Sequence, residues 1–191
     1  MDAATIIHDW KRRLLALANC HEYAYRYTPQ HLLNRRHVEL TTFYGYSESL
    51  VARAEERLNA RFPAVFRQYL LEMAQPGLLF RGSELPGPSE FEQFRDDASE
   101  LMAATDANLK LPPEAVVFLF HQGYTFLYVL ATGGFDGPVM GWTEMDGAPQ
   151  QAAATFADLI EAELQRMEKD CQAVRDLHPT LLPKSWWAFW K

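Results

Sequence analysis

A run of carboxylates between residues 90 and 100 is the densest group of acidic side chains in this sequence. Its members are Glu90, Glu92, Asp96, Asp97 and Glu100, opposed only by Arg95. In a helix, like charges four residues apart cost about 0.2–0.5 kcal/mol per pair. A partner bearing Lys or Arg would relieve that cost and associate faster. Two interpretations remain open, a solvated helix face and a contact surface for a basic partner.

The segment His121-Gln122-Gly123-Tyr124 is the second group with a motif-like pattern, because it separates two apolar runs. One interpretation places His121 and Tyr124 at a contact surface or shallow pocket. The other gives Gly123 the turn conformation and leaves His121 and Tyr124 to pack and hydrogen-bond locally. We count Tyr124, together with Asp136 and Trp142 further along the chain, as candidate partner contacts.

The end of the sequence is aromatic, with Trp186, Trp187, Phe189 and Trp190 among its last six residues. Tryptophan and other aromatic residues dominate the energetics of protein interfaces, so Trp186 and Trp187 are also candidate partner contacts. They could equally fold back over the core, since an exposed cluster of this size promotes aggregation.

Patterns typical of catalysis or of cofactor binding are missing from the sequence. The six histidines and two cysteines show no HExxH or CxxC spacing, and no Gly-x-Ser-x-Gly or phosphate-binding loop occurs. Three carboxylates near expected strand ends, Asp136, Glu144 and Asp146, could do acid–base work if they approached one another. Solvated turn carboxylates are much commoner. We therefore predict no catalytic residue, no metal and no cofactor.

Charge and length narrow the possible partners. The chain has 191 residues and a net charge of −7, and residues 48–170 hold nine Lys/Arg against twenty Asp/Glu. An acidic body repels nucleic-acid phosphate and does not favour an anionic membrane, so we expect neither as a partner. The length suits one sizeable core.

The compartment is predicted from apolar patterning and cysteine usage. No run of about 18 apolar residues exists, and the start lacks the basic and apolar regions of a secretory signal. We therefore expect a cytoplasmic protein, with Cys20 and Cys171 as two reduced thiols; a single disulfide that links the two ends of the chain is the alternative.

Periodicity places these side chains on a series of helices and strands. Ile6, Trp10, Leu14 and Leu17 lie on one face of an N-terminal helix. Helices are expected from Ser47 to Leu58, over 64–74, over 89–104 and from Thr155 onward, and strands over 78–80, 115–120, 125–131 and 139–144. The fold class is therefore α+β: one twisted, mainly antiparallel sheet with helices packed on it. Residues 1–47 form an N-terminal extension, 48–165 the core, and 166–191 a helix end with the aromatic tail.

Several short segments of the core occur in the order and spacing of a known family. They are Ala54–Leu58 with Phe62-Pro63 and Phe66–Leu70, then His121–Tyr124 between its strands, Asp136–Val139, and Thr155–Ile160. Over about residues 48–165 the chain resembles the SUKH superfamily, which contains the fungal Smi/Knr cell-wall assembly regulators and many bacterial immunity proteins.

This resemblance implies a compact α+β domain that binds other proteins and has no catalytic activity or cofactor of its own. The function we predict is that of an immunity protein, which neutralises a cognate bacterial toxin by stoichiometric complex formation; a basic toxin would match the acidic body. The alternatives are an intracellular scaffold or regulatory adaptor that binds proteins reversibly, and a small enzyme of unknown class. The sequence leaves the oligomeric state open.

Overall fold

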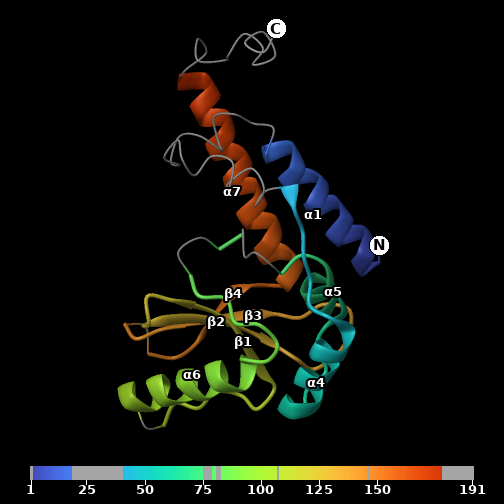
Figure 1. Cartoon of the computed structure of the whole chain (residues 1–191). Coiled ribbons are helices and arrows are strands. Elements are labelled where there is room, and N and C mark those ends of the chain that lie inside the picture. The colour runs from blue at the N-terminus through green and yellow to red at the C-terminus, as the bar shows by residue number, and fades with distance from the viewer. Residues whose placement is uncertain are drawn as a thin grey trace, which may run out of the picture.

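The computed structural model describes residues 2–18, 41–74, 79–80, 83–106, 108–145 and 147–177. Within them the helices are α1 (Ala3–Ala18), α4 (Glu48–Leu58), α5 (Ala64–Glu72), α6 (Phe91–Thr105) and α7 (Phe156–Leu177). The strands are β1 (Ala115–His121), β2 (Thr125–Leu130), β3 (Val139–Thr143) and β4 (Gln150–Ala153). The expected α+β class is confirmed, with α7 above the sheet and α6 below it (Figure 1).

The four strands form one antiparallel sheet in the order β1-β2-β3-β4. Strands β1 and β2 are apolar at nearly every position because both faces of the sheet are covered. Val116 and Val129 face the main core with α5 and α7, whereas Phe120 and Phe126 face a second apolar cluster between the sheet and α6. Both strands are therefore covered on two faces, as their apolar sequences predict, but only β2 is central, because β1 is at the edge of the sheet.

The turn between β1 and β2 also follows the sequence prediction. Gln122 and Gly123 both have positive φ, 53° and 78°, which suits the tight turn of a hairpin. Elsewhere the strand predictions are less accurate. Leu79 and Phe80, expected in a strand, lie in a bend, and β4 was not expected at all.

Side-chain oxygens fix the starts of two helices. Ser47 caps α4, as expected, by accepting a hydrogen bond from the Leu50 amide at 3.3 Å. Thr155 caps α7 through the Asp158 amide at 3.0 Å. The α7 terminus has a second acceptor, Asp136, whose carboxylate binds the amides of the first two helical residues at 3.2 and 3.1 Å.

The N-terminal helix α1 packs on α5 and α7 and belongs to the same core as the sheet. Its buried side chains are Ile7, Trp10, Leu14 and Leu17. The predicted face is correct except at its start, where Ile7 is fully buried and Ile6 only partly. Helix α1, the described helix of the N-terminal extension, is therefore part of the same core as the sheet.

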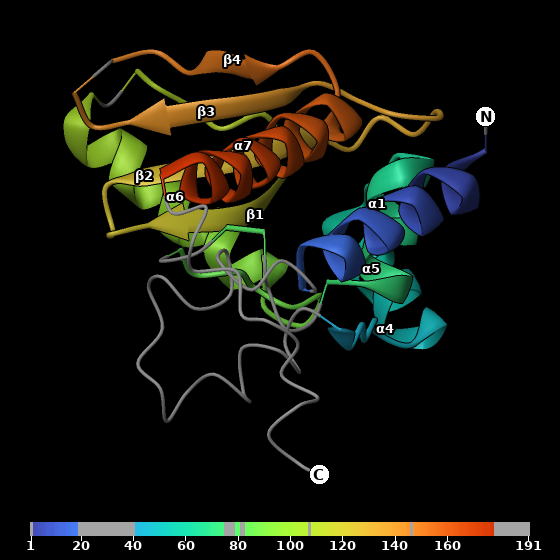
Figure 2. The same cartoon turned by 90° about the horizontal axis from the view of Figure 1, so that it is seen from above.

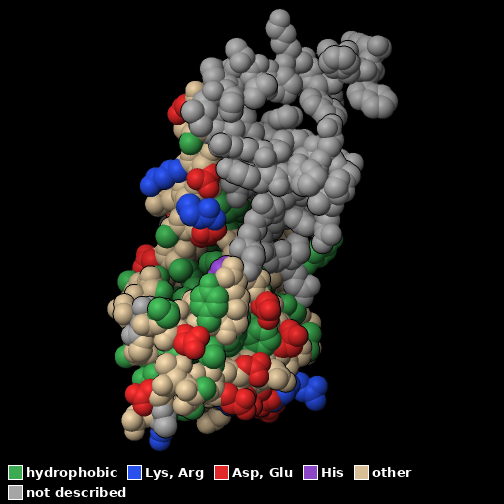
Figure 3. Space-filling view, turned by 90° about the vertical axis from the view of Figure 1, so that its left-hand side faces the viewer, with side chains coloured by type: hydrophobic (Ala, Val, Ile, Leu, Met, Phe, Trp, Pro, Cys, Tyr) green, Lys and Arg blue, Asp and Glu red, His purple; other side chains and the backbone are tan. Residues whose placement is uncertain are grey.

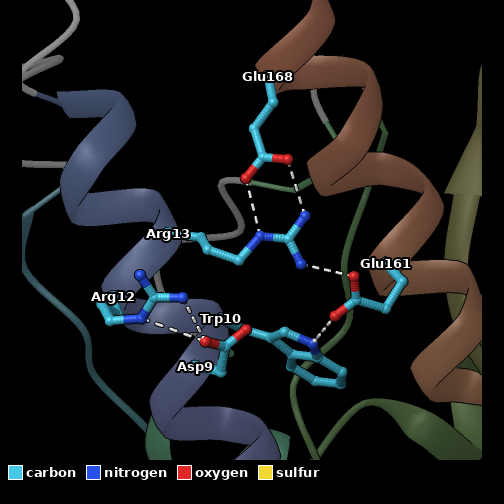
Figure 4. Close-up of polar contacts among 6 residues, drawn as sticks. All are labelled: Asp9, Trp10, Arg12, Arg13, Glu161 and Glu168. Carbon is cyan, nitrogen blue, oxygen red and sulfur yellow. Dashed lines mark hydrogen bonds and ion pairs between the residues drawn. The ribbon is translucent and has the colours of Figure 1, made fainter.

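Polar contacts hold α1 against α7 along one side (Figure 4). The Arg13 guanidinium donates to both carboxylate oxygens of Glu168, at 2.8 and 2.9 Å, and to Glu161 at 2.5 Å. The Trp10 indole N–H donates to Glu161 at 2.8 Å. Hydrogen bonding with Glu168, partly offset by burial, raises the pKa of Arg13, so this guanidinium stays charged.

Helix α7 runs without interruption across residue 165, which the sequence analysis took as the end of the core. Its buried side chains include Phe156, Ile160, Leu164, Met167 and Cys171. Cys171 is disulfide-bonded, so the expectation of two reduced thiols is wrong for this residue. Cys20, the other cysteine of the sequence, lies outside the described residues.

Candidate protein-interaction surface

The carboxylates of α6 are the first candidates for a contact surface, and the structure divides them into two groups. Glu90 accepts a hydrogen bond from the Gly87 amide at 2.8 Å, and Glu92 forms an ion pair with Arg57 of α4. These two side chains are therefore engaged within the fold. Glu92 in particular ties α6 to α4.

The second group comprises Asp96, Asp97 and Glu100, which are all exposed; we call them the α6 acidic face. Asp97 accepts a hydrogen bond from Gln93 at 3.2 Å. Among the residues that the structure describes, no Lys or Arg forms an ion pair with any of the three. Their charge is therefore available to a partner.

This acidic face is electrostatically unfavourable for α6 itself. Asp96 and Glu100 are four residues apart, and Asp97 and Glu100 three, so the like charges are neighbours on the helix surface. Glu100 and the C-cap residue Asp106 also lie toward the negative end of the helix dipole. A cationic group bound there would offset both effects.

Two hairpin turns lie at the end of the sheet and carry exposed apolar side chains. Tyr124 follows β1 and is 42% exposed, and Met145 follows β3 and is 90% exposed. A hydrogen bond from the Glu144 amide to the Tyr124 carbonyl, at 3.1 Å, joins the two turns. We call Tyr124, Glu144 and Met145 the hairpin tips.

Figure 3 shows this end of the molecule in space-filling form. On the lower part of the view, acidic side chains gather with hydrophobic ones between them, and Lys and Arg lie at its margins. A mixture of exposed apolar side chains and one sign of charge is suited to binding a protein of opposite charge.

Of the remaining residues predicted to contact a partner, two are engaged within the fold and two lie outside the described residues. Trp142 is 2% exposed and its indole donates to the Gly147 carbonyl at 2.6 Å, so it presents no surface to a partner. Asp136 is half-buried, and its carboxylate is occupied by the backbone amides that begin α7 and by its own neighbour Gly137 at 2.8 Å. Trp186 and Trp187 lie outside the described residues.

The predicted carboxylate group for acid–base work does not assemble among the described residues. Asp136 precedes β3 and Glu144 follows it, so the two lie beyond opposite ends of a strand that itself spans roughly 13 Å. Asp146 lies outside the described residues. His121, from the other motif, contacts Ser83, whose hydroxyl lies 3.2 Å from Nδ1.

Sequence reasoning missed Met145 and the engagement of Glu90 and Glu92. Met145 is in a turn, where a single exposed apolar residue carries no periodic signal. The ion pair between Arg57 and Glu92 joins residues 35 positions apart, which no local pattern indicates. Within the described residues, no cluster suited to a metal ion occurs, and no helix is both long and apolar enough to span a bilayer.

Comparison with known families agrees with this architecture. The model of the SMI1/KNR4 family (SUKH-1) matches residues 45–162, from just before α4 into α7. The chain therefore belongs to the SMI1/KNR4 family. No curated protein matches the chain.

Proposed function

We propose that this chain is an immunity protein, which neutralises a cognate bacterial toxin by forming a stoichiometric complex and without catalysing a reaction. The observation that carries the proposal is the α6 acidic face, with three exposed carboxylates and no described cation paired to them. Membership of the SMI1/KNR4 family (SUKH-1) is consistent with either an immunity protein or a regulator of the Smi1/Knr4 type.

The mechanism we propose is electrostatic capture followed by apolar contact. The acidic body of the chain, whose net charge as a whole is −7, would accelerate encounter with a basic toxin. Tyr124 and Met145 would then be desolvated against the toxin, since exposed aromatic and methionine side chains are effective interface anchors. The bound chain would cover the toxin's active site or hold the toxin inactive.

Co-expression with the protein encoded directly beside this one tests the proposal. We expect the neighbour alone to arrest growth of the host, and this chain to restore growth and co-purify with the neighbour in a fixed ratio. A neighbour that is harmless, and that does not co-purify, would refute the immunity function.

Charge reversal tests the surface. In the double variant Asp96→Lys with Glu100→Lys we expect at least about tenfold weaker binding, and a weaker dependence of the association rate on salt. The matched control is Glu56→Lys with Asp176→Lys, which changes the net charge equally at exposed positions on α4 and α7. Equal losses in the two double variants would show that net charge, and not the α6 acidic face, determines binding.

An intracellular adaptor is the second candidate, because the same family contains regulators of the Smi1/Knr4 type. The two functions differ in the lifetime of the complex. An immunity protein must hold its toxin, so we expect nanomolar or tighter binding with slow dissociation. Micromolar affinity with rapid exchange would favour the adaptor.

We also propose that the protein works in the cytoplasm. Fractionation of cells that carry a tagged copy of the chain tests this location, and we expect the tagged protein in the cytoplasmic fraction. Recovery of the tagged protein from an oxidising compartment, where the disulfide of Cys171 would persist, would refute it.

A further inference from the structure

The two edge strands of the sheet, β1 and β4, differ in whether another segment pairs with their outer side. At the β1 edge, the amide of Glu84 donates to the Phe120 carbonyl at 2.7 Å, and the Phe120 amide donates back at 2.9 Å. This edge is therefore partly closed by backbone pairing. At the other edge β4 is outermost, and Figure 2 shows no described segment beyond it.

Strand β4 carries none of the charges that usually protect an exposed edge. Gln150, Gln151 and Ala152 are exposed and Ala153 is half-buried. Packing against the core therefore does not account for the absence of charged side chains from this strand. Residues 147–157 contain no charged side chain, although charged residues make up 23% of the chain. Natural edge strands are commonly blunted by charge, especially by Lys, because their free amides and carbonyls recruit other strands.

The surroundings of β4 indicate what kind of strand it would accept. Helix α6 begins next to the aromatic rings of α5, where Phe91 lies 6.3 Å from Phe66. It then crosses beneath the sheet, and its other end lies under the hairpin end of β3 and β4 in Figures 1 and 2. Ala98 is buried toward the sheet, so Asp96 and Glu100, two residues to either side of it, point away from the sheet. An added strand would therefore meet the net acidic charge of the body and not the α6 acidic face.

We propose that the free edge of β4 binds an extended, basic segment of the partner protein as an additional strand, with Lys or Arg side chains that match the acidic body. This inference rests on the proposed function and specifies how the partner is held. Main-chain hydrogen bonds would supply affinity and the charged side chains would supply selectivity, as in other cases of strand addition. A second copy of the chain is a poor occupant, because it would bring together two proteins of charge −7.

Hydrogen exchange on the complex with the neighbouring protein tests this mode of binding. We expect amide exchange in a peptide covering residues 148–155 to slow by at least about tenfold on complex formation. A peptide that covers α4, which the proposal leaves outside the contact, is expected to keep the amide exchange rate of the free protein.

Proline substitution isolates the backbone contribution. Successive strand amides point alternately to the two sides, so one of Gln150 and Gln151 directs its N–H outward. We test both Gln150→Pro and Gln151→Pro. The variant at the residue whose N–H points outward should keep the wild-type unfolding midpoint but bind the partner about tenfold more weakly. The matched controls Gln150→Ala and Gln151→Ala retain the amide and are expected to bind normally.

The outcomes separate this inference from the proposed function. Slowed exchange in β4, together with a loss of binding that is specific to proline, would support strand addition. A tight complex in which β4 exchanges as fast as in the free protein would overturn strand addition and leave the immunity function standing. Failure to form any complex would overturn both.

Discussion

Replacement of Trp10 by alanine tests whether α1, which lies outside the family match, is part of the folding unit. The Trp10 side chain is 1% exposed, packs edge-to-face on Phe156 at 6.4 Å and donates to Glu161 at 2.8 Å. Removing a large aromatic side chain from a core costs about 3–5 kcal/mol. The lost hydrogen bond adds little, because Glu161 keeps its contact with Arg13.

We therefore expect the free energy of unfolding of Trp10→Ala to fall by about 3–5 kcal/mol. For a chain of this size each kcal/mol lowers Tm by about 2–4 °C, so the expected decrease is about 6–20 °C. Thermal and urea unfolding, followed by far-UV circular dichroism, would measure both quantities.

The control lies on the outer side of the same helix. Leu15 is 39% exposed, so Leu15→Ala should change stability by no more than about 0.5 kcal/mol. If Trp10→Ala were as stable as Leu15→Ala, α1 would not belong to the core, and the packing argument for the N-terminal extension would be refuted.

Three further predictions concern single contacts. Asp136→Ala should lower the free energy of unfolding by about 1–2 kcal/mol in urea titrations, because the start of α7 loses its acceptor; unchanged stability would contradict that role. Gly45→Ala should cost about 1–3 kcal/mol or more, since a Cβ atom would meet the Leu71 carbonyl oxygen at 1.7 Å; a variant with the wild-type Tm would contradict this close approach. Burial acts to raise the pKa of Glu72, but the hydrogen bonds from Lys11 and Gln68, together with the nearby positive charge, outweigh burial and hold the pKa below the ordinary 4.5. The stability from this pair should therefore be present above pH 4.5 and decline as the pH falls through the folded-state pKa, less steeply in Glu72→Gln; parallel pH profiles would exclude this contribution.

The parts of the fold that sequence predicted are those whose signal is local and apolar. Strands β1 and β2 were evident from continuous apolar runs around Gly123, and α1 from its four-residue spacing. Strand β4 could not be found in this way, because glutamine and alanine have little preference for strands and its position is set by pairing with β3.

The candidate site was predictable only in part, for a related reason. Carboxylate density identified α6, but the sequence could not show that Glu92 binds Arg57 whereas Asp96 has no described ionic partner. Asp136 was chosen as a contact residue, yet its carboxylate binds amides about twenty residues further along the chain. A role that depends on which residues surround a side chain in the folded protein cannot be predicted from the residues next to it in the sequence.

The packing of α1 on α7 has a consequence for synthesis of the chain. Trp10 leaves the ribosome well before its partners Phe156 and Glu161, which lie about 150 residues later in the sequence. At typical elongation rates of about 5–20 residues per second, this part of the apolar face of α1 waits roughly 7–30 s for its partners. Over that interval α1 is a natural target for chaperones, and the last contacts of this helix form only after α7 has been synthesised.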